Sequence, residues 1–183
     1  MVDVVVVGDG PTGLQAALLL AKNGMETVVY GTDETYMHDA YLYNYLGVEE
    51  VHGSDFIDTA RAQAEEHGAE LRDAEVVDAA AGEDGVTVET ADGTETVGDY
   101  LVLAEGDART VAASLDIEMD DDDVVVADKY GNTSQENVYA GGWTARDNRV
   151  QAAISVGDGA AIALTILSEE KGTTFHDFDV PPE

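Results

Sequence analysis

The sequence predicts an α/β fold in which helices flank a parallel sheet and a small antiparallel hairpin layer is attached to it. Three observations support this prediction. A β-branched run at 2–7 is followed by a glycine-rich turn, a helical pattern and a second β-branched run at 27–30, which is the order of a βαβ unit. Alternating apolar residues flank a turn at 91–93. The apolar run at 100–104 is typical of a buried parallel strand.

The first half of the chain begins with the strand at 2–7, which ends at a glycine. Residues 13–24 carry apolar side chains at helical spacing and end in an Asn-Gly pair, a common C-terminal helix cap. After the second strand, residues 31–53 are rich in tyrosine, histidine and aspartate, and we expect an irregular loop. Ser54 is expected to cap a helix over 55–67.

The second half continues with residues 69–78 and 84–98, whose alternating apolar residues predict the hairpin layer. Residues 116–123 form an acidic linker. Short strands are expected at 124–127 and 138–141, on either side of a polar turn.

The last predicted elements are a helix and a tail. A helix with alanine and isoleucine on one face is expected over about 149–171. The tail at 172–183 ends in Pro-Pro-Glu, and we expect it to be loose. A chain of 183 residues without an internal repeat is long enough for one domain, which we assign to 1–171.

The net charge disfavours several classes of partner. The chain contains 39 Asp and Glu against 8 Lys and Arg, which gives a formal net charge of −31. Such a surface repels phosphate, so binding to nucleic acid or to an anionic membrane is disfavoured. Because the acidic residues are spread along the whole chain and lysine is scarce, the composition indicates a halophilic protein. The alternative is a single acidic docking face.

Cysteine is absent from the sequence, which excludes disulfides, thiolate nucleophiles and iron–sulfur ligation. None of the four histidines has the spacing of a metal-ligand motif, so no metal site is expected. The apolar run Val4–Val7 is far too short to span a bilayer, and the N-terminus lacks the pattern of a signal peptide. We therefore expect a cytoplasmic protein.

The strongest motif is Gly8-Asp9-Gly10-Pro11-Thr12-Gly13, a GxGxxG between a predicted strand and a predicted helix. In such motifs the first glycine permits a tight turn, the second lets a pyrophosphate approach the backbone, and the third lets the helix pack on the strand. The helix N-terminus adds free N–H groups and partial positive charge. We expect dinucleotide binding; the alternative is a loop that keeps this shape without a ligand.

Dinucleotide-binding folds usually carry an acidic residue at the end of the second strand, where it holds a ribose. Tyr30 stands there in this sequence, followed by Gly31. Asp33 or Glu34 could serve from the loop, or the backbone could hold the ribose. In so acidic a chain, both residues are equally compatible with ordinary surface acids.

Four stretches of the chain resemble the pyridine nucleotide-disulfide oxidoreductase superfamily, and its thioredoxin reductase-like flavoproteins most closely. They are the first βαβ segment at 4–32, the loop 43–47, the strand and turn 101–109, and the C-terminal segment 132–159. Together they cover most of the chain. The resemblance implies a Rossmann-like FAD/NAD(P)-binding domain with FAD extended along the sheet.

The resemblance also assigns positions to this FAD. The pyrophosphate would lie on the glycine loop, at Gly8, Gly10, Pro11, Thr12 and Gly13. The adenosine would lie near Gly31, Thr32 and the backbone of Val76. Asn44 would approach the flavin, and Ala104 and Gly106 would border the cofactor. Gln151 and Ala152 would meet the isoalloxazine.

The sequence departs from the family pattern in several places. The connection from Arg109 to Asn132 is too short for the family's inserted NADPH domain, and no second GxGxxG occurs. The redox cysteines are missing. The family has a Gly-Asp pair whose carboxylate binds the ribityl chain, whereas this chain has Gly142-Trp143. Glu105 replaces a threonine beside the cofactor path.

Some residues keep two interpretations. Trp143 could stack on the flavin or line a pocket in its place, or it could fill a gap in the core or a dimer contact and block FAD. Asp147 or Asp158 could replace the missing carboxylate. His38, next to Asp39, is either a proton donor near a ring or an ordinary loop histidine.

A cluster of tyrosines lies between the second strand and the following helix. Tyr36, Tyr41, Tyr43 and Tyr45 would either wall a flavin or binding surface, or pack the loop on the domain or on a second subunit. The resemblance implies a dimer, and we predict a homodimer with Tyr41, Tyr43 and Tyr45 at or near the contact.

These observations predict an FAD-binding, thioredoxin reductase-like oxidoreductase without redox cysteines or a nicotinamide domain. It would pass electrons between the flavin and an external donor or acceptor. One alternative is a non-enzymatic dinucleotide-binding or dimerisation module derived from the same family, and a second is an NAD-binding dehydrogenase. No catalytic residues can be assigned from the sequence.

Overall fold

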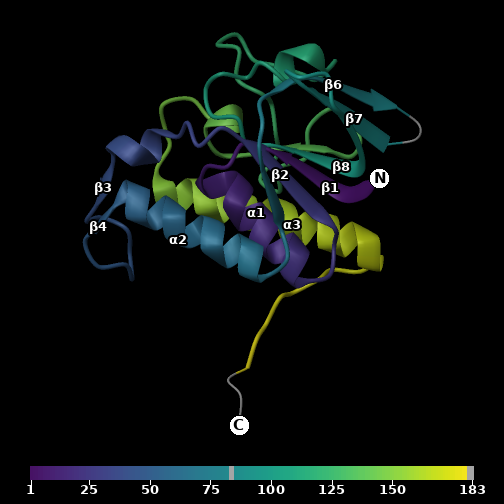
Figure 1. Ribbon diagram of the computed structural model, residues 1–183. Coiled ribbons are helices and arrows are strands. Elements are labelled where there is room, and N and C mark those ends of the chain that lie inside the picture. The colour runs from purple at the N-terminus through teal and green to yellow at the C-terminus, as the bar shows by residue number, and fades with distance from the viewer. Residues whose placement is uncertain (83–84, 181–183) are drawn as a thin grey trace.

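The computed structural model describes residues 1–82 and 85–180, and it is organised around one mixed sheet with helices against it (Figure 1). The sheet has seven strands in the order β5-β2-β1-β8-β7-β6, with β9 paired to β8. This architecture confirms the fold class predicted from the sequence. The strands are β1 (Val2–Val7), β2 (Thr27–Gly31), β5 (Glu70–Asp73), β6 (Val76–Gly82), β7 (Gly85–Thr90), β8 (Glu95–Leu103) and β9 (Val138–Ala140).

The central strand of the parallel part is β1, since β2 and β8 pair with it on either side. Val5 lies opposite Val28 of β2 and Leu101 of β8. Its β-branched side chains are buried on both faces of the sheet, as expected for a central parallel strand. Because β1, β2 and β8 run in the same direction, the loops that follow them meet at one edge.

The long strand β8 is shared by two partners on the side away from β1. Its first residues pair antiparallel with β7, from Glu89 opposite Glu95 to Val86 opposite Gly98. Its last residues pair parallel with β9, with Leu101 opposite Val138. The antiparallel layer therefore branches from the same strand that completes the parallel sheet.

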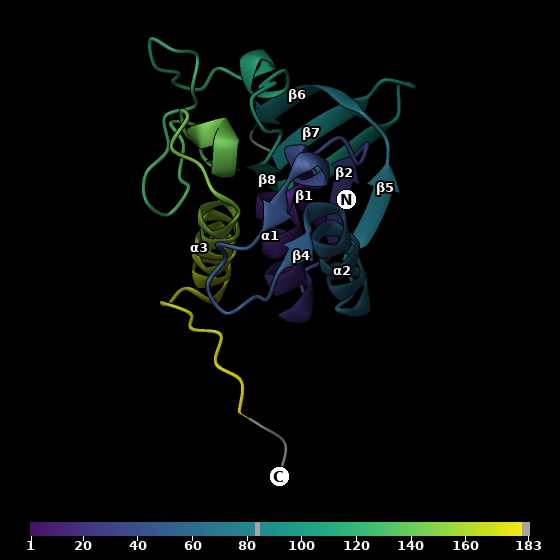
Figure 2. The same cartoon turned by 90° about the vertical axis from the view of Figure 1, so that its left-hand side faces the viewer.

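Three α-helices cover one face of the sheet: α1 (Pro11–Lys22), α2 (Gly53–Glu66) and α3 (Ala152–Lys171). Helix α1 lies between the other two in both views (Figures 1 and 2). Leu14 and Leu20 of α1 are buried in one core with Ile57 of α2 and Ile162 of α3. Close packing of α1 and α3 depends on Gly159, because a Cβ there would lie 2.2 Å from the carbonyl oxygen of Thr12.

The opposite face of the sheet is covered by the antiparallel layer and by the segment that follows β8. A second buried core joins Val7 and Leu103 of the parallel strands to Val88 of β7 and to Val111 and Val125. The glycine loop and the end of β8 lie between these two cores. Their backbone is therefore supported from both sides of the sheet.

Two local predictions were wrong. Ser54 does not cap α2: the N-cap residue is His52, and Gly53 is already helical. The helix begins directly after a two-stranded sheet of β3 (Tyr41–Leu42) and β4 (Val51–His52), in which the Gly53 N–H donates to the Ala40 carbonyl at 2.9 Å. The expected irregular loop is therefore partly ordered by hydrogen bonds that the sequence pattern does not reveal.

The second wrong prediction concerns residues 124–127, which do not form a regular strand. Val125 makes an isolated bridge with Met119, and the N–H groups of Val125 and Val126 donate to different segments, at Thr144 and Glu118. Helix α3 begins at Ala152, later than the expected start at about residue 149, because Gln151 is still extended, with φ −149° and ψ 154°.

Helix α3 is 20 residues long with a mean hydropathy of 1.3, so it meets the length and composition of a membrane span, which no segment was expected to do. Its contacts with α1 identify it as a core helix of this domain. The chain after α3 leads away from the helices (Figure 2), and Lys22 binds Asp177 of this tail at 2.8 Å. Residues 181–183 of the predicted tail and residue 84 of the predicted hairpin lie outside the described residues.

Candidate functional site

A cavity of about 860 Å³ opens at the carboxyl ends of β1, β2 and β8. Its wall is built from the glycine loop, the end of β2, the short 3₁₀ helix Tyr36–Asp39, the segment after β8 and the N-terminus of α3. Its volume is in the range of small-molecule and cofactor sites, and ligands of parallel α/β sheets bind at this edge. This cavity is the candidate functional site.

The glycine loop brings β1 and β8 into close contact at the floor of the cavity. Gly8 has a φ of +107°, and a Cβ there would lie 2.1 Å from the carbonyl oxygen of Ala104. Gly13 approaches the loop in the same way, since a Cβ there would lie 1.9 Å from the carbonyl oxygen of Gly8. Larger side chains at these two positions would displace the loop from the sheet.

Two helix N-termini border the same cavity. Helix α1 starts at Gly10 and Pro11, with no side-chain cap and no acidic residue in its first turn among the described residues. Helix α3 starts after Gln151, and this end too lacks a side-chain cap in the described part of the chain. Uncapped N–H groups and the helix dipoles give both ends partial positive charge, which favours an anionic ligand such as a pyrophosphate.

The carboxylates beside the glycine loop have partners of their own. Asp9 is 6% exposed, and its Oδ2 accepts hydrogen bonds from the Arg61 guanidinium and from the Asp33 N–H at 3.2 Å. Glu105 accepts from the N–H groups of Val111 at 2.9 Å and Ala112 at 2.8 Å. Burial raises the pKa of Glu105, and these backbone donors act in the opposite direction. Both side chains therefore also hold the walls of the cavity in place.

Trp143 contributes an aromatic wall. Its ring meets that of Tyr36 with centroids 4.9 Å apart and planes inclined at 50°, and both residues line the cavity. Arg109 fixes this segment by donating to the carbonyl oxygens of Trp143 at 2.8 Å and Thr144 at 3.1 Å. The tryptophan therefore occupies a defined position in the wall.

Comparison with known proteins identifies the site's family. Residues 45–159 match the family described as "Pyridine nucleotide-disulphide oxidoreductase". The chain belongs to this family. Residues 1–39, which contain the glycine loop, match the "FAD binding domain" family.

The relatives of this chain include bacterial thioredoxin reductases. The Aquifex aeolicus enzyme is 32% identical over 108 residues, which is 57% of this chain and 33% of that protein. The Streptomyces clavuligerus enzyme is 35% identical over 80 residues, 41% of this chain and 25% of that protein. The matched regions thus span a quarter to a third of these relatives' length.

Solved structures of thioredoxin reductases share the fold. The enzyme from Gloeobacter violaceus superposes with a TM-score of 0.86 at 19% identity, over 98% of this chain and 99% of that one. The atypical thioredoxin reductase of Desulfovibrio vulgaris Hildenborough gives 0.85 at 19% identity, over 94% of this chain and 99% of that one. At this identity the likeness concerns the fold alone.

Most of the residues that the sequence assigned to the oxidoreductase cofactor lie together. The cavity is lined by Gly8, Gly10, Pro11, Thr12, Gly31, Thr32, Asn44, Val76, Ala104, Gly106, Trp143, Gln151 and Ala152. Gly13 and Gly142 do not line it in the described structure; both are buried, and Gly142 has a φ of +61° with its Cα against Thr12. Their place is in the packing beneath the cavity.

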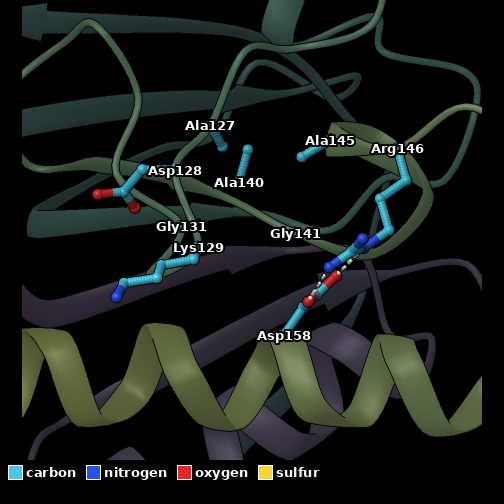
Figure 3. Close-up of a pocket in the computed structure, with 9 residues that line it drawn as sticks. All are labelled: Ala127, Asp128, Lys129, Gly131, Ala140, Gly141, Ala145, Arg146 and Asp158. Carbon is cyan, nitrogen blue, oxygen red and sulfur yellow. Dashed lines mark hydrogen bonds and ion pairs between the residues drawn. The ribbon is translucent and has the colours of Figure 1, made fainter.

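Asp158 and Asp147, the acids considered as substitutes for the missing carboxylate, have other partners. Asp158 projects from α3 and accepts from Arg146 at 2.7 and 2.8 Å (Figure 3). It also accepts from the Gly142 N–H at 3.0 Å. It lines a second cavity of about 120 Å³. Asp147 binds Arg149 at 2.8 Å. Among the described residues, neither carboxylate lines the larger cavity.

His38 lies on the wall of the cavity with two polar partners. Its Nδ1 is 3.0 Å from Ser54 Oγ, and its Nε2 is 3.0 Å from Asp33 Oδ1. The hydrogen bond with Asp33 raises the pKa of His38 above the ordinary histidine value. The structure thus pairs His38 with Asp33, although its sequence neighbour Asp39 had been considered.

Sequence reasoning missed two residues of the site. Asp9 was treated only as a variable position of the motif, and Arg61 only as part of a helix. The pattern could have shown that an acid at the second position of a phosphate-binding loop needs a cation nearby. Only the packing of α2 shows that Arg61, of the eight basic residues, is the partner of Asp9.

Proposed function

We propose that this protein is an FAD-binding oxidoreductase that relies on an external partner to supply or remove electrons. The cavity into which the glycine loop and two uncapped helix N-termini open is the observation that carries this proposal. Bound FAD would supply the redox chemistry, and the protein would supply its orientation and surroundings.

The residues present fit such a cofactor. Thr12 and the N-terminus of α1 would hold the pyrophosphate, since both border the cavity. The first turn of this helix contains no acidic residue that would repel the phosphates. Gly31, Thr32 and Val76 line the part of the wall that would hold the adenosine. Asn44, Gln151 and Ala152 line the part toward the flavin. The match of residues 1–39 to the FAD-binding domain family supports the part of this assignment that lies on the glycine loop and the end of β2.

Two features of the sequence support an external partner. Cysteine is absent, so the chain has no dithiol of its own to reduce. Residues 110–137, between β8 and β9, contain one short 3₁₀ helix (Ala112–Ser114) and no second nucleotide-binding motif. A separate reductase or a diffusing nicotinamide would therefore have to reach the flavin.

The decisive experiment is an absorption spectrum of the purified protein in molar salt, before and after addition of FAD. We expect a flavin spectrum that remains with the protein after gel filtration. A Gly13→Ala variant serves as the control, because its glycine loop cannot keep the same contact with the helix. Colourless wild-type protein that fails to retain added FAD would overturn the proposal.

A second candidate function is a non-enzymatic binding module, and Trp143 is the observation that favours it. The Trp143–Tyr36 pair stands in the cavity wall where the resemblance places a ribityl-binding carboxylate. A module of this kind would bind a nucleotide without turnover. Photoreduction of bound FAD, followed by anaerobic mixing with a quinone, separates the two: reoxidation no faster than that of free reduced FAD would support the module.

We also propose that the protein is a homodimer in the cytoplasm. The loop after β3 exposes apolar side chains, with Tyr43 72% and Leu46 97% exposed, and Tyr41 lies beside Tyr43. Such side chains are covered at low cost by a second subunit. Light scattering in molar salt should give about twice the chain mass of 19.3 kDa. A mass near that of one chain at all concentrations would contradict the dimer.

A further inference from the structure

Strand β2 ends at Gly31, one residue after Tyr30, where the sequence pattern placed its end, so a glycine occupies the last strand position, at which dinucleotide-binding folds usually carry an acid. Gly31 is the last residue of the strand, and it lines the large cavity. The expected acid at this position would accept a hydrogen bond from a ribose hydroxyl. A carboxylate that binds a ribose at this edge would come from another part of the chain, and both Asp9 and Glu34 line the cavity.

The carboxylate of Asp9 fills the space where a side chain at position 31 would start. A Cβ on Gly31 would lie 2.2 Å from Asp9 Cγ, 2.4 Å from Oδ1 and 2.6 Å from Oδ2. These are the three nearest atoms to that point, so Asp9 is what excludes a side chain there. Backbone conformation does not require the glycine, because Gly31 is not among the residues with positive φ.

Asp9 is held so that one carboxylate oxygen remains available. Its Oδ2 accepts from the Arg61 guanidinium and from the Asp33 N–H. Its Oδ1 has no hydrogen-bond partner among residues 1–82 and 85–180, and no polar side-chain atom of this part of the chain is both fully buried and unpartnered. Oδ1 therefore keeps access to solvent, and Asp9 borders the cavity.

Arg61 makes this arrangement compatible with a phosphate-binding loop. An ionised carboxylate beside a pyrophosphate would repel it, but the guanidinium from α2 binds Asp9 directly and reaches Asp73 at 3.2 Å. The carboxylate of Asp9 can then accept a hydrogen bond from a neutral donor such as a hydroxyl, while the Arg61 guanidinium compensates its negative charge. If Asp9 served only to join the glycine loop to α2 through Arg61, its carboxylate would not need to lie at the end of β2.

We propose that Asp9 is the ribose-binding carboxylate of this protein. It extends from the glycine loop to the end of β2 and takes the place of the acid that is usually found at the position of Gly31. This proposal rests on the proposed function, in that the ligand is a nucleotide with an adenosine ribose. The 2′-hydroxyl donates to Oδ1 of Asp9, and Arg61 positions the carboxylate. Asp9 and Gly31 are therefore one unit, and the acid can stand at either position but not at both.

The test compares three ligands by calorimetry in molar salt: FAD, ADP-ribose, and ADP-ribose whose adenosine ribose lacks the 2′-hydroxyl. Wild-type protein should bind ADP-ribose about tenfold or more tightly than the deoxy compound, because a hydrogen bond to a charged acceptor is lost. Asp9→Ala, which removes the carboxylate altogether, should bind the two compounds with a ratio near one. Arg61 is left in place in this variant.

A position swap tests the exchange directly. Asp9→Gly should lose the preference for the 2′-hydroxyl, and Gly31→Asp alone should be destabilised by contact with Asp9. The double variant, Asp9→Gly with Gly31→Asp, should fold and recover the preference to within a few-fold. Thermal melts by circular dichroism confirm which variants are folded before their affinities are compared.

The outcomes separate this proposal from the proposed function. Binding of ADP-ribose that depends on Asp9, without binding of FAD, would support Asp9 and overturn the flavoprotein. Binding of FAD and ADP-ribose with no preference for the 2′-hydroxyl in wild type would overturn the role of Asp9 and leave the flavoprotein intact. A folded double variant without the preference also overturns the exchange, and failure of the wild type to bind any of the ligands overturns both.

Discussion

Tyr36 and Trp143 meet in the wall of the cavity, with ring centroids 4.9 Å apart. Tyr36 comes from the segment after β2, and Trp143 from the 3₁₀ helix Gly142–Ala145 after β9. Offset and inclined rings at this distance attract one another beyond their burial. The pair therefore joins the first βαβ unit to the C-terminal part of the chain across the site.

Trp143 is the only tryptophan in the sequence, so its fluorescence reports on the cavity directly. We expect addition of FAD to quench this emission in a saturable way, because a bound flavin would lie close enough to accept its energy. Trp143→Phe should abolish the signal and retain an aromatic wall. Emission that stays constant while FAD binding is seen by calorimetry would place the cofactor away from Trp143.

Two glycines of α3 provide a matched test of the packing beneath the site. Gly159 faces α1, where a Cβ would lie 2.2 Å from the Thr12 carbonyl oxygen, whereas a Cβ on the exposed Gly157 would have no atom within 4 Å. Gly159→Ala should lower the free energy of unfolding by about 1–3 kcal/mol. Gly157→Ala should raise it by up to about 1 kcal/mol, because alanine is the better helix former. Denaturant melts of both variants measure the difference; equal effects would contradict the close contact of α1 and α3.

The pairing of His38 with Asp33 predicts a pH dependence with a definite sign. The hydrogen bond to Asp33 raises the pKa of His38 in the folded protein, so the protonated form is favoured by folding. Its contribution to stability is complete below the pKa of the unfolded chain and is lost as pH rises through the folded pKa. NMR titration of the His38 ring should give a pKa above the ordinary value, and Asp33→Asn should lower it.

Asp39→Asn is the control for this titration, since Asp39 is the neighbour of His38 in sequence but not its hydrogen-bond partner in the structure. It should leave the pKa of His38 nearly unchanged. A larger shift in Asp39→Asn than in Asp33→Asn would contradict the pairing.

Stability should depend strongly on salt. Among residues 1–82 and 85–180, five of the eight basic side chains pair with carboxylates, so most acids of this part of the chain have no cation at ion-pair distance. The Debye length falls from about 30 Å at 0.01 M to about 3 Å at 1 M salt, so repulsion across the domain is screened only at high salt. Melts followed by circular dichroism should show a loosened or unfolded protein below about 0.1 M and a cooperative transition at molar salt.

Protonation provides an independent check on this explanation. At low salt, acidification to about pH 4 should neutralise many carboxylates and partly restore the transition, until precipitation near the isoelectric point of about 4.1. An unchanged cooperative melt from dilute buffer to molar salt would contradict a role for charge repulsion, and with it the halophilic interpretation.

The parts of the structure that follow from local patterns could be predicted from the sequence. The β-branched run of β1, the glycine loop and α1 each depend on contacts between residues close in sequence, and the loop supplies Gly8, Gly10, Pro11 and Thr12 to the cavity's lining. Helix α2 and the turn at 91–93 followed from the same kind of signal.

The rest depends on which segments meet in space. Asp158 accepts hydrogen bonds from Arg146 and from the Gly142 N–H only because α3 packs beside the segment after β9. Val125 and Val126 have the composition of a strand, but their N–H groups find carbonyl oxygens on two different segments. In a chain with 39 acids, composition alone cannot identify the few that have a specific partner.

The contact of Gly159 with the Thr12 carbonyl has a consequence for biogenesis. The first turn of α1 is synthesised well before α3, yet its final position depends on contact with that helix. Contacts between such distant residues form slowly compared with local ones. A nascent chain that ends before residue 159 lacks this contact, so the first turn of α1 can reach its final packing only after Gly159 has been synthesised.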